Sequence, residues 1–269
     1  MSAEHLLGLL RLPPVQRAIF AIAASGAIFP IVGVWIIGLN IVPVRFAMMH
    51  VALLGISVGI LLGWEPNITG IVMCGITGAL LSPLARRPSG LAGPMGLVMT
   101  FAIALALLIL SISGVNANGA FELLWGAILA TRVQDVVNLI SVAALIIAVY
   151  FKWRKELALL LYDREIALIS GVPVDGLTLL LMVVVAIAIG SSVRLTGALL
   201  VDSITILPAL AARNLGRSLK EMILWAMGVG LVGNLAGFAL TLILNQPPGP
   251  VLVITVSLIT LATYFVKQS

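Results

Sequence analysis

Few residues in this 269-residue chain are of the types that make or break covalent bonds. There are two histidines, His5 and His50, and one cysteine, Cys74. These exclude a disulfide framework, a CxxC metal site and a zinc centre of the HExxH type. None of the lysines lies in a GxxxxGK[ST] phosphate loop, and no Ser-His-Asp set or carboxylate pair stands out. We therefore expect no enzymatic activity, and any ATP hydrolysis must come from a partner chain.

His50 and Asp202 are the candidate metal ligands, because they are the two ionisable residues that we expect at membrane depth. An imidazole together with a carboxylate can hold a divalent metal ion transiently. Asp202 lies in the apolar run LLVDSITILP, and an aspartate at the centre of a membrane helix costs about 2.5 to 3.5 kcal/mol. Two structural explanations stay open. His50 can be a packed histidine bonded to a carbonyl, and Asp202 can pair with Arg194 two turns earlier.

The composition places the chain in a membrane. Hydrophobic residues make up 61% of it and charged residues only 9%, from 15 Lys and Arg and 10 Asp and Glu. A soluble chain would carry about 25% charged residues. Soluble, disordered and nucleic-acid-binding proteins are therefore excluded. We predict an all-α, polytopic membrane protein with a single transmembrane domain over residues 1–269.

Nine apolar segments approach the length needed to cross a hydrocarbon core of about 30 Å. They lie near 18–39, 46–63, 68–84, 92–112, 136–151, 176–190, 198–212, 220–243 and 250–266. Proline and glycine interrupt several of them, so we predict short, broken helices. The number of spans is eight or nine, because the basic residues near the N-terminus conflict with the orientation that the other loops predict. Residues 120–130 are too short to cross and are predicted to form a re-entrant or interfacial helix. Cys74 and the Met48-Met49 pair could form a soft-metal path, although methionine more often fills a helix core.

Glycines spaced four residues apart indicate close helix packing. Gly55, Gly59 and Gly63 follow this spacing in the second span, and Gly233 and Gly237 follow it in a later one. Small residues at this spacing let helix backbones approach each other in a membrane. We therefore predict that the second span lies at the centre of the bundle.

The basic residues predict the orientation. Clusters at 152–164 and 213–220 are separated by two crossings, so both are predicted to be cytoplasmic. The same count places 113–131 outside. It also puts the N-terminus outside, although Arg11 and Arg17 favour the opposite side. The N-terminal apolar run of about 22 residues is too long for a signal peptide, so we interpret it as a retained first span.

The segment 152–175, predicted to be cytoplasmic, mixes charges with apolar residues, in the run KWRKELALLLYDREIALISGVPVD. We predict a helix-turn-helix that lies along the membrane, with Gly171 ending the second helix and Pro173 just beyond it. A short amphipathic helix at a membrane face either lies among the headgroups or docks into a groove of another protein. The residues alone leave both possibilities open.

The stretch YDREIALISGVPVDGL resembles the coupling segment of the metal-importing ABC permeases, the ABC-3 family. Asp163, Ala167 and Gly171 stand at the spacing found in that family. Four further stretches resemble the family's motifs in the family's order. They are FAMMHVALLGI (46–56), ELLWGAIL (122–129), VRLTGALLVDSITILPALAA (193–212) and NQPPGPVLVI (245–254).

This resemblance implies a homodimer with a translocation pathway on its two-fold axis, in the cell (inner) membrane of a bacterium or archaeon. Two copies of a cytoplasmic ATPase, which uses ATP-Mg, would dock on the 155–172 helices. An extracellular or periplasmic binding protein would deliver the zinc, manganese or iron. The residues implied in coupling are Asp163, Glu165, Ala167 and Gly171, and Glu122 takes the place of an outer gate. The chain itself would bind no cofactor and no nucleic acid.

Two positions depart from the family pattern. Phe46 stands where relatives often carry an aspartate, four residues before the histidine of the second span. Asn245 and Gln246 stand where an aspartate is common at the Pro-Gly turn. Both changes remove hard oxygen ligands, which leaves the metal undetermined. The hypothesis is that His50 and Asp202 line the path and compensate for the loss.

Three other functions remain as alternatives. An ATP-independent secondary transporter usually carries several intramembrane acids, whereas Asp202 is almost alone here. An ABC permease for another small solute or metal complex, such as a siderophore, shares the many-span design but is usually longer. A non-transporting scaffold protein would change no ATP turnover in response to solute.

Overall fold

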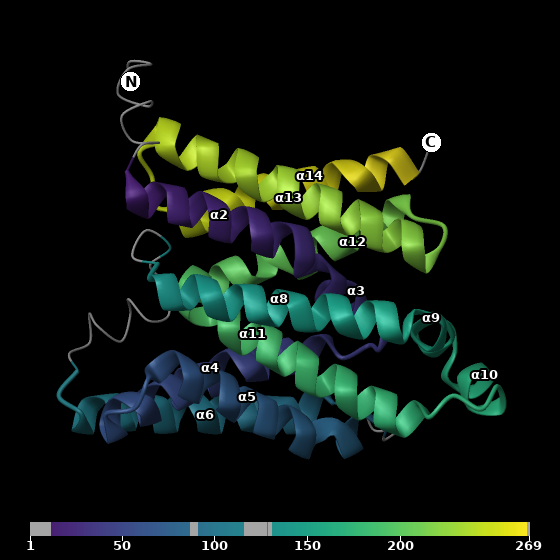
Figure 1. The fold of residues 1–269 in the computed structure, drawn as a ribbon, viewed down its shortest axis with the longest axis horizontal. Helices are drawn as coiled ribbons and strands as arrows, with labels where there is room; N and C mark the ends of the chain where they lie inside the picture. Colours follow the sequence, from purple (N-terminus) through teal and green to yellow (C-terminus); the bar gives the residue numbers. More distant parts are fainter. Residues whose placement is uncertain (1–11, 87–90, 116–127, 129–130, 268–269) are drawn as a thin grey trace. The chain divides into compact units, whose positions relative to one another are not determined.

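The computed structural model describes residues 12–86, 91–115, 128 and 131–267. This part of the chain is built of helices and turns without a strand, which confirms the all-α prediction (Figure 1). It holds eight helical segments long and apolar enough to cross a membrane. They are Pro13–Gly38, Val42–Leu62, Pro66–Ala85, Ala92–Ile112, Val133–Lys152, Val174–Val193, Leu219–Leu244 and Pro248–Phe265. Nearly all of the predicted re-entrant helix at 120–130 lies outside the described residues.

The helices follow one another with short connections. Their bounds are α2 Pro13–Ile28, α3 Pro30–Gly38, α4 Val42–Leu62, α5 Pro66–Leu81, η1 Ser82–Arg86, α6 Ala92–Ile112, α8 Val133–Lys152, α9 Arg154–Tyr162, α10 Arg164–Ile169, α11 Val174–Ile204, α12 Ile206–Leu215, α13 Leu219–Leu244 and α14 Pro248–Lys267. Prolines stand in the first turn of α2, α3, α4, α5 and α14, because proline has no N–H to lose there and its φ already suits a helix. Left-handed residues follow several helices, among them Gly63 after α4 (φ 67°) and Asn245 after α13 (φ 53°).

The chain divides into two compact units. Unit 1 comprises Met1–Val34, Trp125–Ala144 and Leu195–Ser269. Unit 2 comprises Trp35–Leu124 and Leu145–Arg194. In unit 1, α13 packs against α2, α12 and α14. In unit 2, α4 packs against both α5 and α6.

Glycine contacts bring the helices of unit 1 together. A Cβ added to Gly230 of α13 would clash with the carbonyl oxygen of Gly26 of α2. A Cβ on Gly237 would lie 2.9 Å from Cα of Leu252 of α14, and one on Gly233 would lie 3.2 Å from Val256. The predicted packing role of Gly233 and Gly237 is therefore confirmed, since both lie against α14 and a Cβ at Gly237 would press on its backbone.

The helix α4 is one of the two most buried spans of unit 2. Its most apolar stretch is 72% buried, as is that of Val174–Val193, against 28% for Pro66–Ala85 and 22% for Ala92–Ile112. The central position of the second span in the whole bundle stays a prediction. A Cβ on Gly55 would lie 2.7 Å from Cα of Gly70 of α5, and one on Gly59 would lie 2.9 Å from Cα of Pro66. Gly63 differs from the prediction. A Cβ there would meet no described atom within 4 Å, and the residue ends α4 with positive φ instead of packing.

The predicted span near 198–212 is interrupted. The helix α11 has a kink at Gly197 (φ 74°, ψ 161°), and a second break follows at Thr205 (φ −108°, ψ −68°), before α12. Pro208 accounts for the second break, since it offers no N–H to the carbonyl of Ile204 and its ring crowds that carbonyl. Residues 198–204 thus form a short helical piece between two breaks.

Each end of the first span has a described contact, and the predicted outward position of the N-terminus stays a prediction. Arg17 of α2 donates from Nη1 to the carbonyl of Thr131, just before α8 (3.3 Å). At the other end of the first span, a Cβ on Gly38 would lie 2.8 Å from the side chain of Leu161 of α9, which follows α8.

Candidate functional site

Asp163 forms the turn between α9 and α10. Its backbone is extended (φ −156°, ψ 124°), and its Oδ1 accepts hydrogen bonds from the backbone N–H groups of Glu165 (2.8 Å) and Ile166 (3.0 Å). A carboxylate in this position satisfies N–H groups that have no partner within the helix. The helix-turn-helix predicted for 152–175 is therefore present, and Asp163 determines the direction in which α10 leaves α9.

The end of α10 is a Schellman motif. The N–H of Val172 donates to the carbonyl of Ala167 (3.0 Å), and the N–H of Gly171 donates to that of Leu168 (3.1 Å). Gly171 has φ 78°, a left-handed conformation that favours glycine. Ala167 is wholly buried. Three of the four predicted coupling residues (Asp163, Ala167, Gly171) thus have definite structural roles, while Glu165 is exposed in the first turn of α10.

Side chains around α10 form an exposed apolar surface, which we call the α10 surface. Its members, with their exposed fractions, are Tyr162 (83%), Ile166 (44%), Leu168 (53%) and Ile169 (88%). In contrast, Leu157 and Leu160 of α9 are buried. Exposed apolar groups gathered on a short polar segment are typical of a surface that a protein or a lipid covers.

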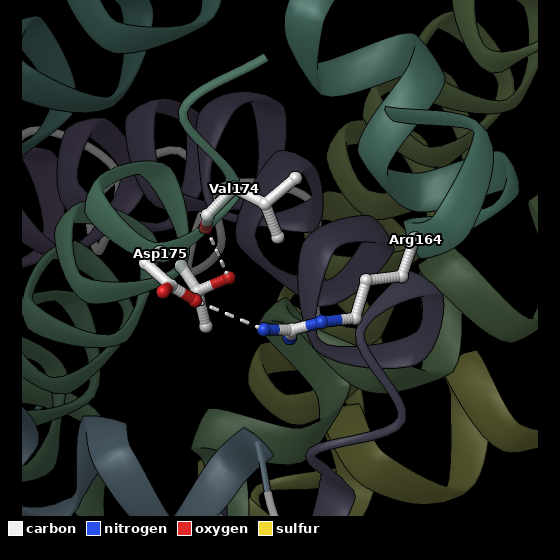
Figure 2. Close-up of polar contacts among 4 residues, drawn as sticks. Arg164, Val174 and Asp175 are labelled. Carbon is white, nitrogen blue, oxygen red and sulfur yellow. Dashed lines mark hydrogen bonds and ion pairs between the residues drawn. The ribbon is translucent and has the colours of Figure 1, made fainter. Parts of the chain in front are cut away.

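An ion pair ties this segment to the next span. Arg164 Nη2 lies 3.1 Å from Oδ1 of Asp175, and this bond joins the first residue of α10 to the first turn of α11 (Figure 2). Beside it, the hydroxyl of Thr178 donates to the carbonyl of Val174 (2.7 Å). A displacement of α10 can therefore reach α11 through a side-chain contact as well as along the chain.

His50 lies on α4 in unit 2 and is half-buried. Its Nδ1 is buried without a hydrogen-bond partner among the described residues, so no described carbonyl holds that nitrogen. One turn earlier, Phe46 is 44% exposed, and the guanidinium of Arg45 lies 4.1 Å from the centroid of its ring. The ring of Phe46, at the position where the resemblance implied an aspartate, is therefore stacked against the Arg45 guanidinium.

Asp202 lies in unit 1, on the short piece between the breaks at Gly197 and Thr205, and is half-buried. The side chain of Arg194, its suggested partner, is outside the described part of the chain. The two predicted ligands thus belong to different units. Across the described residues, no three His, Cys, Asp or Glu side chains come close enough together to hold a metal ion.

The remaining predicted residues take structural positions or cannot be located. Cys74 is fully buried, and its Sγ donates to the carbonyl of Met48 (3.4 Å). Met48 and Met49 are 0% and 6% exposed, so these residues fill the core of unit 2, as the alternative to a soft-metal path predicted. Glu122, the predicted gate, lies outside the described residues.

The sequence interpretation missed a buried polar contact in unit 1. Asn234 of α13 and Ser203 are both wholly buried, and their side chains meet at 3.0 Å. The available signal was a lone asparagine in the otherwise apolar run of α13, because polar residues at membrane depth are rare without a purpose.

Comparison with known proteins covers nearly the whole chain. The model of the ABC 3 transport family matches residues 12–267. The manganese import system permease protein ScaB of Streptococcus gordonii is 27% identical over 267 residues, which is 99% of this chain and 96% of the relative. The high-affinity zinc uptake system membrane protein ZnuB of Haemophilus influenzae is 23% identical, over 82% of this chain and 85% of the relative. A solved structure of PsaBC from Streptococcus pneumoniae in complex with Fab has a TM-score of 0.86 and 25% identity, covering 99% of this chain and 96% of that one.

Proposed function

The chain belongs to the ABC 3 transport family, and from that premise we propose that it is the permease of an ATP-driven importer of divalent metal ions, with manganese as the first candidate. Members of this family are transport components and not enzymes. Manganese comes before zinc because the relative named for manganese is more similar, at 27% identity against 23%.

The α10 surface is the observation that carries this proposal. An ATP-driven transporter whose own chain lacks a phosphate loop depends on another chain for ATP hydrolysis, and the two chains must meet at an exposed surface. The α10 surface is apolar, and it stands on a segment whose shape is fixed by the Asp163 cap and the turn at Gly171. A rigid apolar projection suits a groove of a partner protein, as in helix-in-groove recognition.

The assembly that we propose is a homodimer with two copies of a cytoplasmic ATPase docked on the α10 surfaces. Closure of the ATPase pair on ATP would displace α10. The Arg164–Asp175 pair would carry this displacement to α11, which is 72% buried over its apolar stretch. An outer binding protein would deliver the ion, and His50 and Asp202 would lie along its path. The location is the cell membrane of a bacterium or archaeon.

The test is uptake of radioactive manganese by liposomes that hold the permease with its co-purified ATPase. We expect uptake that requires ATP and that excess unlabelled manganese suppresses more strongly than excess zinc. Uptake that persists without any ATPase would favour a secondary transporter and contradict the proposal.

A substitution on the α10 surface tests whether the ATPase binds there. Ile169→Asp puts a charge on the most exposed member of the α10 surface. Lys220→Ala, exposed in the first turn of α13 and outside the predicted docking helices, serves as its control. We expect Ile169→Asp to lower ATPase binding at least about tenfold, because truncating or charging a central apolar contact costs about 2 kcal/mol or more. Lys220→Ala should bind as the unaltered chain does. Equal binding by all three chains would show that the ATPase docks elsewhere.

A further inference from the structure

The helix is interrupted between α11 and α12, at a place where polar side chains are wholly buried. The amide of Asn234 donates from Nδ2 to the backbone carbonyl of Ser203 (3.1 Å) and to that of Gly230 on its own helix (2.7 Å). The hydroxyl of Ser203 lies 3.0 Å from Asn234 Oδ1. One carboxamide thus bonds both the backbone and the side chain of a residue 31 positions away. We call this pair of contacts the Asn234 clasp.

The depth of the clasp makes it energetically important. Asn234 lies near the middle of α13, which runs from Leu219 to Leu244, so the break lies near mid-depth in the membrane. Backbone that leaves the helical conformation at this depth is tolerated only where protein or enclosed water satisfies its polar groups. Without its bonds to Ser203, the amide of Asn234 would lose two of its partners in an apolar surrounding.

Other elements of unit 1 hold the same break. Thr260 of α14 donates from its hydroxyl to the carbonyl of Leu207 (3.0 Å). On α3, a Cβ on Gly33 would clash with the carbonyl of Thr205. At the far end of α12, Asn214 Nδ2 donates to the hydroxyl of Thr263 (3.1 Å). The backbone from Ser203 to Leu207 is therefore fastened from three sides.

We infer that Asn234 is a positioning residue for transport, which fastens the broken segment to α13 so that α12 and α13 move as one body. A helix break is a natural hinge, because the hydrogen bonds that stiffen a helix are missing there. The Asn234 clasp restricts bending at the break. A displacement that α10 passes to α11 therefore also moves α12 and α13.

The inference rests on the proposed function for its ATPase, and its test uses the same reconstituted complex. Asn234→Leu keeps the number and branching of the side-chain heavy atoms and removes every bond of the clasp, whereas Ser203→Ala removes only the hydroxyl contact. Thr241→Val is the matched control. Thr241 is buried on the same helix, and its hydroxyl donates to the carbonyl of Gly237, within α13 itself (3.1 Å). The readouts are manganese transported per ATP hydrolysed and hydrogen–deuterium exchange of peptides covering 197–209.

We expect Asn234→Leu to lower manganese transport per ATP about tenfold while ATP hydrolysis and ATPase binding continue, and Ser203→Ala to lower it about threefold. Exchange over 197–209 should rise about tenfold in Asn234→Leu. Thr241→Val should match the unaltered chain in both readouts.

The following results would contradict the positioning role of Asn234. It fails if Asn234→Leu keeps the unaltered ratio and exchange, or if Thr241→Val loses as much as Asn234→Leu. If Asn234→Leu does not fold, an unchanged ratio and exchange in Ser203→Ala count against the inference in the same way. A complex of the unaltered chain without ATP-driven uptake contradicts the proposed function instead, and the exchange measurement still decides the clasp.

Discussion

Arg164 and Asp175 form an ion pair of 3.1 Å that joins the first residue of α10 to the first turn of α11. The pair spans the turn in which Gly171 adopts positive φ, so this turn is closed both by backbone hydrogen bonds and by charge. α11 begins directly beside it and continues into the most buried part of unit 2. The α10 surface and a buried membrane helix are thus linked through one side-chain contact.

Exchanging the two charges tests this link. The side chains are 38% and 61% exposed, so the pair should contribute about 0 to 1 kcal/mol to stability, and Arg164→Asp alone should leave the folded protein intact. We expect Arg164→Asp and Asp175→Arg each to lower ATP-driven uptake severalfold, and the double variant to regain most of it. Proteoliposome uptake measures this. No recovery in the double variant would mean that Arg164 and Asp175 act separately.

Removing the Asp163 cap should loosen α10. Asp163→Ala leaves the N–H groups of Glu165 and Ile166 without their acceptor, which costs about 1 kcal/mol. Asp163→Asn keeps an acceptor oxygen and is the control. Hydrogen–deuterium exchange over 164–172 should rise about fivefold in the alanine variant and little in the asparagine variant. Equal exchange in both would show that the cap does not hold α10.

Gly171 and Gly176 form a matched pair in the same segment. A Cβ on either would meet no described atom within 4 Å, but only Gly171 has positive φ. Gly171→Ala should therefore cost about 1 kcal/mol through backbone strain alone, whereas Gly176→Ala, inside α11, should be neutral or slightly stabilising. Thermal unfolding of the purified permease measures the difference. A larger loss for Gly176→Ala would contradict the strain argument.

A second matched pair lies on α13. Gly230→Ala would drive a methyl group into the Gly26 carbonyl of α2, whereas a Cβ on Gly228 would meet no described atom within 4 Å. We expect Gly230→Ala to destabilise the protein by about 1 to 3 kcal/mol and Gly228→Ala to leave stability unchanged. Thermal unfolding in detergent compares them. Similar midpoints would mean that α2 and α13 can separate at little cost.

The metal path is tested at His50 and Asp202. We expect His50→Ala and Asp202→Ala, singly and together, to raise the manganese concentration needed for half-maximal uptake by about tenfold or more, because each removes a ligand type suited to the ion. ATPase binding should not change, since neither residue lies on the α10 surface. If the double variant reaches half-maximal uptake at the same manganese concentration as the unaltered chain, neither residue lies on the path.

Local signals in the sequence already determine most of the helices and the form of the coupling segment. Apolar runs, prolines in first turns and the Asp163-to-Gly171 spacing act over a few residues, so they can be recognised without knowing the fold. The same reasoning interpreted Gly63 as a packing residue, although it ends α4. A four-residue spacing fits both roles, and only the surroundings of Gly63 distinguish them.

The tertiary structure alone decided which distant residues meet. Gly26 meets Gly230, and Asn234 fastens Ser203 across the break before α12. Helices in a membrane associate through close backbone approach and scarce polar bonds, and apolarity by itself assigns no partner. The hydropathy of α13 therefore predicted a span but could not indicate which helix its asparagine would hold.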